Sequence, residues 1–134
     1  MQIEPQAPAF AKRYARGEAQ VVWTTLVSDL ETPVSAFLKI AGERPMSFLL
    51  ESVEGGAVRG RYSIIGLKPD LIWRSFGNRA EINRRARFAA DAFEPVSGGA
   101  LDSLRALVRE CRVDIDAPLP PMAAGLFGLS LIHI

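Results

Sequence analysis

Short strand-like segments joined by brief turns are the feature that most restricts how this chain can fold. Ser47–Ser52, Tyr62–Ile65 and Leu71–Phe76 are apolar, β-branched or aromatic runs, and each predicts a strand. A Gly-Asn dipeptide at 77–78 separates the third run from Arg79–Asn83, which predicts a β-hairpin with a II′-type turn. Because strands joined by short turns pair antiparallel, we expect an α+β fold, a largely antiparallel sheet with helices packed on it.

Three helices are predicted around these strands. The first spans residues 7–16, and the second begins with Thr32 as its N-cap and ends at Gly42. Its apolar face is expected to carry Pro33, Phe37, Ile40 and Ala41. The third helix, Leu101–Cys111, is amphipathic. Its apolar stripe is expected to consist of Leu101, Leu104, Val108 and Cys111.

Three further segments complete the prediction. Val21–Val27 is β-branched and aromatic, so we expect a buried strand there. Residues 53–61 contain three glycines and predict an exposed loop. Residues 84–99 predict a mixed loop rich in Arg, Ala and Gly.

Composition narrows the class of protein. The chain has 134 residues, 49% of them hydrophobic and 23% charged, which is ordinary for one globular domain. The formal net charge is +1, and the basic cluster of Arg79, Arg84, Arg85 and Arg87 has little aromatic interleaving. A solvated face explains that cluster better than a nucleic-acid surface does, so we expect no nucleic-acid partner.

The N-terminus and the rare residue types indicate a cytoplasmic protein. The first twenty residues lack the apolar core of a signal peptide, and no apolar run approaches the roughly 20 residues that span a bilayer. We therefore expect no membrane partner. Cys111 is the single cysteine, which excludes an internal disulfide, and His133 is the single histidine. Metal or triad chemistry based on histidine therefore has almost nothing to use here.

One segment combines groups that suit a ligand. Glu51 and Ser52 end an apolar strand after Leu50, and Arg59 and Arg61 follow about ten residues later. A carboxylate, a hydroxyl and a guanidinium together can bind the ammonium and carboxylate groups of a free amino acid. The same residues also fit a plain structural role, in which Glu51 and Arg61 form a salt bridge and Ser52 caps a turn.

A resemblance to a known family decides in favour of the ligand. The segments SDLETPVSAFLKI (28–40) and SFLLESVEGGAVRGRYSIIGLKPD (47–70) resemble the N-terminal region of the anthranilate synthase large subunit, component I. GNRAEIN (77–83), LDSLRALVREC (101–111) and LPPMAAGLFG (119–128) continue the resemblance in order. We therefore divide the chain into an N-terminal arm (1–19), an incomplete component I region (20–128) and a tail (129–134).

The resemblance implies a reaction and a regulatory site. The family converts chorismate, with ammonia that a glutamine amidotransferase subunit supplies, into anthranilate and pyruvate. It uses Mg²⁺, and tryptophan inhibits it. The family's tryptophan site maps onto Leu50, Glu51, Ser52 and Arg61, with Arg59 as the alternative basic residue.

The resemblance also sets limits. The family's chorismate and magnesium residues lie in a C-terminal part that is not in this sequence. We therefore assign no catalytic residue and no metal ligand, and this chain alone is expected to be inactive. Residues 129–134, LSLIHI, depart from the family's pattern, and we expect a non-native tail from a truncated reading frame. Two alternatives remain open, a stand-alone amino-acid-binding module and a fragment of aminodeoxychorismate synthase component I.

Overall fold

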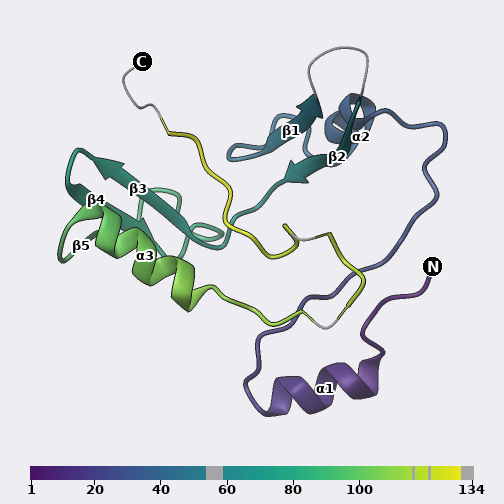
Figure 1. The fold of residues 1–134 in the computed structure, drawn as a ribbon, viewed down its shortest axis with the longest axis horizontal. Coiled ribbons are helices and arrows are strands. Elements are labelled where there is room, and N and C mark those ends of the chain that lie inside the picture. The colour runs from purple at the N-terminus through teal and green to yellow at the C-terminus, as the bar shows by residue number, and fades with distance from the viewer. Residues whose placement is uncertain (54–58, 116, 121, 131–134) are drawn as a thin grey trace. The chain divides into compact units, whose positions relative to one another are not determined.

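The part of the chain that the structure describes contains three helices and five strands (Figure 1). The computed structural model describes residues 1–53, 59–115, 117–120 and 122–130, and at 52–53 and 59–61 it describes the backbone alone. In chain order the elements are α1 (Ala7–Ala15), α2 (Pro33–Ile40), β1 (Phe48–Val53), β2 (Arg59–Gly66), β3 (Ile72–Phe76), β4 (Arg79–Asn83), β5 (Glu94–Val96) and α3 (Ala100–Glu110). All strand pairs are antiparallel, which confirms the predicted α+β class. No helix in the described ranges is long and apolar enough to cross a bilayer.

The chain divides into two compact units. One unit comprises Met1–Val27 and Leu101–Ile134, and the other comprises Ser28–Ala100. The strands belong to the second unit, where they form two hydrogen-bonded sheets, a β1–β2 hairpin and a three-stranded sheet of order β3–β4–β5.

The first unit contains α1 and an extended segment that returns beside the N-terminus. Trp23 makes a two-hydrogen-bond antiparallel bridge with Glu4, with N···O distances of 2.7 and 2.8 Å. The buried strand expected at Val21–Val27 is wrong, because this bridge is its only backbone pairing among the described residues and Val27 is 89% exposed. Composition predicted a strand here, but a strand also needs a hydrogen-bonded neighbour, and in the described part of the chain this segment has one at Trp23 alone.

Helix α2 begins as its sequence predicts. Thr32 is the N-cap, its hydroxyl accepts from the Ser35 amide, and the Ser35 hydroxyl accepts from the Thr32 amide, which completes a capping box. Of the predicted apolar face, Ala41 is buried and Pro33 and Phe37 are half-buried. Ile40 is 48% exposed, so its assignment to that face was wrong.

The three-stranded sheet is held together by a tight turn and by hydrogen bonds from its own Asn83 side chain. The β3–β4 hairpin pairs Phe76 with Arg79 across the predicted Gly77-Asn78 turn, and Gly77 has φ 61°, as a II′ turn requires at its first position. Asn83 at the end of β4 is fully buried. Its amide donates to the carbonyls of Ala89 and Ala90, and its oxygen accepts from the Arg85 amide. These bonds fold the chain after β4 back onto the sheet, and β5 follows within the segment that was predicted to be a loop.

Helix α3 has a different buried stripe from the predicted one. Leu101 and Val108 are 67% and 53% exposed, so their assignment to the buried face was wrong. The residues that are buried or half-buried are Ala100, Ser103, Leu104, Leu107 and Cys111. The buried stripe is shifted by about one residue relative to the predicted one. The prediction missed this because the stripe includes Ser103, which is small enough to lie inside although its hydroxyl is polar.

Candidate functional site

The β1–β2 hairpin carries all four residues that the sequence nominated. Leu50 pairs with Ile64, and Glu51 pairs with Ser63, in a regular antiparallel register. Ser52 is the next residue of β1, and Arg61 lies two residues before Ser63 in β2. The structure therefore brings these backbone positions together at one end of the hairpin. The side chains of Ser52, Arg59 and Arg61 lie outside the described part of the structure.

The register of the hairpin changes at this end. A continued regular register would pair Val53 with Arg61, but Val53 pairs with Arg59 instead. Between these two pairs β1 has one residue, Ser52, whereas β2 has three, residues 60–62, so the extra residues lie in β2 opposite Ser52. Such bulges bend a strand and redirect its side chains, and they are frequent beside functional sites.

Two described side chains of β1, at the end of the hairpin near Ser52, are exposed. Leu50 is 48% exposed, and Glu51 is exposed as well. Glu51 makes no ion pair with any residue whose side chain the structure describes. Because successive side chains of a strand point to opposite faces, Leu50 and Glu51 are accessible on opposite faces of the hairpin, and the Glu51 carboxylate is available to an ammonium group.

The hairpin is supported at its other end. The ring of Phe48 lies over Gly66, so a Cβ at position 66 would come within 2.2 Å of Phe48 Cζ. Only glycine fits there, and this close approach fixes the pairing of Phe48 with Gly66. The neighbouring Ser47 has a buried hydroxyl without a partner among the described residues.

Helix α2 contacts both strands of the hairpin (Figure 1). Glu31, just before α2, accepts from the Ser35 hydroxyl and forms an ion pair with Lys39. The hydrogen bond from Lys39, followed by that from Ser35, lowers the pKa of the Glu31 carboxyl from its usual range. These contacts hold the helix that lies against β1 and β2.

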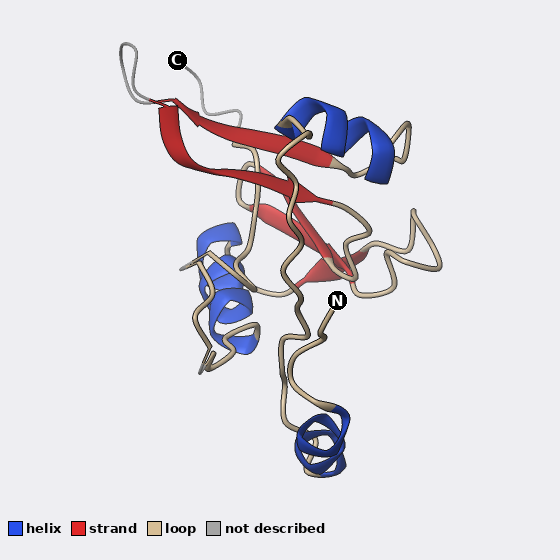
Figure 2. Cartoon of the chain, turned by 90° about the vertical axis from the view of Figure 1, so that its right-hand side faces the viewer, coloured by secondary structure: helices blue, strands red, loops and turns tan. Residues whose placement is uncertain are grey.

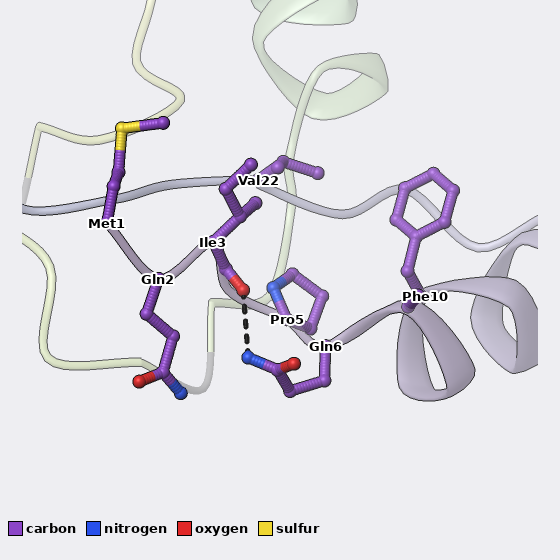
Figure 3. Close-up of a pocket in the computed structure, with 8 residues that line it drawn as sticks. Met1, Gln2, Ile3, Pro5, Gln6, Phe10 and Val22 are labelled. Carbon is purple, nitrogen blue, oxygen red and sulfur yellow. Dashed lines mark hydrogen bonds between the residues drawn. The ribbon is translucent and has the colours of Figure 1, made fainter.

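A second concave feature lies in the N-terminal arm and was not predicted. A hollow of about 590 Å³ is lined by Met1, Gln2, Ile3, Pro5, Gln6, Ala7, Phe10 and Val22 (Figure 3). The Gln6 side-chain amide donates to the Ile3 carbonyl at 3.1 Å. Because this amide is already bonded, the remaining lining is mainly apolar. None of the lining side chains is an acid or a base. Nothing in the spacing of the first ten residues indicated it.

Within the described ranges, no three His, Cys, Asp or Glu side chains gather as a metal site requires. A hydrogen bond between Arg16 and Glu18 raises the pKa of the Arg16 guanidinium and lowers that of the Glu18 carboxyl, and hydrogen bonds from Lys39 and Ser35 lower the pKa of Glu31. The residues that the structure describes offer no group of ligands for Mg²⁺.

Comparisons with known proteins point to one family. An anthranilate synthase component 1 from Cereibacter sphaeroides is 52% identical over 120 residues, which cover 90% of this chain and 24% of that protein. The protein of the same name from Synechocystis is 36% identical over 95% of this chain and 24% of its own length. That from Mycolicibacterium smegmatis is 38% identical over 77% of this chain and 19% of its own length.

These relatives show which family the chain belongs to and which part of the family's length it covers. No protein-family model matches the sequence, and no solved structure matches it significantly. The chain spans about a quarter, or less, of the length of the curated relatives it matches. Similarity along almost the whole chain shows that it belongs to the anthranilate synthase component 1 family and corresponds to the N-terminal part of those proteins.

Proposed function

We propose that this chain is the tryptophan-sensing N-terminal part of an anthranilate synthase component 1. In the complete protein, chorismate and ammonia from a glutamine amidotransferase subunit are converted into anthranilate and pyruvate with Mg²⁺ bound. The observation that carries this proposal is the 52% identity with the Cereibacter sphaeroides protein over 90% of the chain. The chain itself binds neither chorismate nor Mg²⁺ and is inactive alone.

The hairpin supports the regulatory part of the proposal. Glu51 is an exposed carboxylate that can bind the ammonium group of tryptophan, and Leu50 offers exposed apolar surface on the other face of β1 at the same end of the hairpin. Ser52 stands at the irregular point of the register, where its hydroxyl can donate to or accept from the ligand. Arg61 is the proposed partner of the ligand carboxylate, and Arg59 is the alternative.

The catalytic part is tested by restoring the missing region. A chimera would join residues 1–128 of this chain to the C-terminal part of the Cereibacter sphaeroides relative. With chorismate, ammonium and Mg²⁺, we expect the chimera to form anthranilate, detected by its fluorescence, whereas the 134-residue chain forms none. A chimera that folds but forms no anthranilate would contradict the assignment, and turnover by the 134-residue chain would contradict its proposed inactivity.

The regulatory part needs a separate readout. Tryptophan should inhibit the chimera, and Glu51→Gln should raise the tryptophan concentration for half-inhibition about 10-fold, because a charge-assisted hydrogen bond is lost. The basal rate of the variant should stay unchanged, since Glu51 takes no part in chemistry. Equal inhibition of the variant and the parent chimera would show that Glu51 does not contact the ligand.

A further inference from the structure

Within Val22–Val27, Trp23 is the one residue that makes backbone hydrogen bonds in the described part of the chain. The single bridge in this region uses both the amide and the carbonyl of Trp23 for Glu4. In an extended chain, neighbouring residues direct these groups to the opposite edge, so those of Val22, Thr24 and Leu26 face away from Glu4. In the described part of the chain these three residues make no backbone hydrogen bond.

The side chains of the same segment are apolar and exposed. Val22, Leu26 and Val27 are 53%, 65% and 89% exposed. Their β-branched and aliphatic composition is typical of a buried strand and is costly to leave in water. Exposure of both the backbone edge and the apolar side chains in one segment is the property of a strand that lacks its neighbour.

The apolar surface next to this segment can form part of the same interface. Residues 2–4 and 22–24 run side by side (Figure 2), and the Thr24 hydroxyl donates to the Gln2 carbonyl at 2.7 Å. Ile3 and Val22 from this ribbon line the apolar hollow (Figure 3). The open backbone edge and the hollow therefore share one residue, Val22.

We propose that Val22–Leu26 is a strand-docking edge, and that its occupant is a β-strand from the C-terminal part that the longer relatives carry. Resting on the proposed function, this inference identifies the partner as the same polypeptide in its complete form. The relatives are about four times as long as this chain, so most of their residues have no counterpart here. The docked strand would bond the outer backbone edge, and its apolar side chains would cover Val22, Leu26 and the hollow.

Amide hydrogen exchange tests the inference directly. It would compare the 134-residue chain with the chimera, at the amides of Val22, Thr24 and Leu26. We expect at least about 100-fold slower exchange in the chimera, because backbone bonds in a packed sheet exchange only by opening. The Trp23 amide is the internal reference, since it is bonded to Glu4 in both proteins.

The outcomes separate this inference from the proposed function. A chimera that forms anthranilate while these amides exchange as fast as in the chain alone would overturn the docking edge and leave the function intact. Slowed exchange in a folded but inactive chimera would support the edge and contradict the function. Slowing in the 134-residue chain alone that grows with its concentration would assign the edge to a second copy and overturn the proposal.

A pair of variants in the chimera gives an independent test. Thr24→Pro removes the outward amide, whereas Thr24→Val removes only the hydroxyl bond to Gln2. We expect Thr24→Pro to lower the yield of soluble chimera at least about 10-fold, and Thr24→Val to leave it near the parent level. Equal yields of the two variants would contradict a bonded strand at this position.

Discussion

The two sheets of this chain differ in the contacts that their described side chains make. In the three-stranded sheet, Arg74 bonds Glu81 across β3 and β4 at 2.8 Å, and its guanidinium lies 3.6 Å from the centre of the Phe93 ring. The fully buried Asn83 bonds the segment that leads to β5. The β1–β2 hairpin has a register shift instead, and its Leu50 and Glu51 are exposed.

The three-stranded sheet is therefore mainly a structural element, whereas the β1–β2 hairpin has side chains that are available for binding. Paired charges and a satisfied buried amide stabilise the β3–β4–β5 sheet but leave nothing to recognise a ligand. The Glu51 carboxylate has no ion-pair partner among the described side chains, so it is available for recognition of a cationic group. The proposed tryptophan site therefore lies at the end of the hairpin where the described Leu50 and Glu51 are exposed.

The largest expected effect lies in the three-stranded sheet. Asn83→Ala would leave two carbonyls and one amide without their buried partner, so the sheet should be destabilised by about 2–4 kcal/mol. Amide exchange of β4 would measure the loss, and β1 and β2 should be less affected. Asn78→Ala, which removes one bond to the Ala100 amide, is the matched control with a smaller effect. Equal loss in both sheets would mean that they are not independent.

The next effect lies in the hairpin. Gly66→Ala places a Cβ 2.2 Å from Phe48 Cζ, so the ring must move and the hairpin should lose about 1–3 kcal/mol. Amide exchange of β1 and β2 would report it. The double variant with Phe48→Leu should recover part of the loss, because the smaller side chain leaves room for the methyl group. Failure of the double variant to recover any of it would contradict a steric cause.

A smaller effect is expected in the helix that lies against the hairpin. Thr32→Ala removes one half of the capping box of α2 and should destabilise that helix by about 1 kcal/mol. The amides of the first turn of α2 should exchange faster, while those of β3 and β4 should not change. Thr32→Ser keeps the accepting hydroxyl and is the control that should behave as the parent chain does.

The smallest effect is a pH dependence of the same helix. The pKa of Glu31 is lowered from its ordinary value of 4.5 in the folded chain, so its contribution to stability is present above that value. The contribution is lost as the pH falls through the lower, folded pKa. Amide exchange in the first turn of α2, corrected for the intrinsic rate, should rise below pH 4.5, and Glu31→Gln should remove that rise. An unchanged pH profile in the variant would show that Glu31 is not responsible.

Local signals allowed part of this structure to be predicted. The Thr32 cap and the Gly77-Asn78 turn depend on residues close together in sequence, and both were found as expected. Other features depend on distant partners. Glu94–Val96 is only three residues long and becomes a strand by pairing with β4, and the stripe of α3 shifts because a serine lies inside it.

In the candidate site, too, the features that depend on local sequence were predicted and those that depend on distant partners were not. A local run of apolar residues ending in an acid predicted β1 and the place of Leu50 and Glu51 within it. The change of register at Ser52 was not predictable, because it arises from the pairing of β1 with β2. Val21–Val27 has the composition of a strand but lacks a pairing partner for most of its length, so composition alone could not indicate its exposure.

Tryptophan inhibition of two matched hydroxyl deletions tests the central claim most directly. Ser52→Ala and Ser63→Ala would be made in the chimera, one at the register shift and one opposite Glu51 in the neighbouring strand. The account predicts that Ser52→Ala raises the half-inhibitory tryptophan concentration about 10-fold with an unchanged basal rate, and that Ser63→Ala leaves inhibition near the parent value. Undiminished inhibition of Ser52→Ala would contradict a tryptophan sensor in this hairpin.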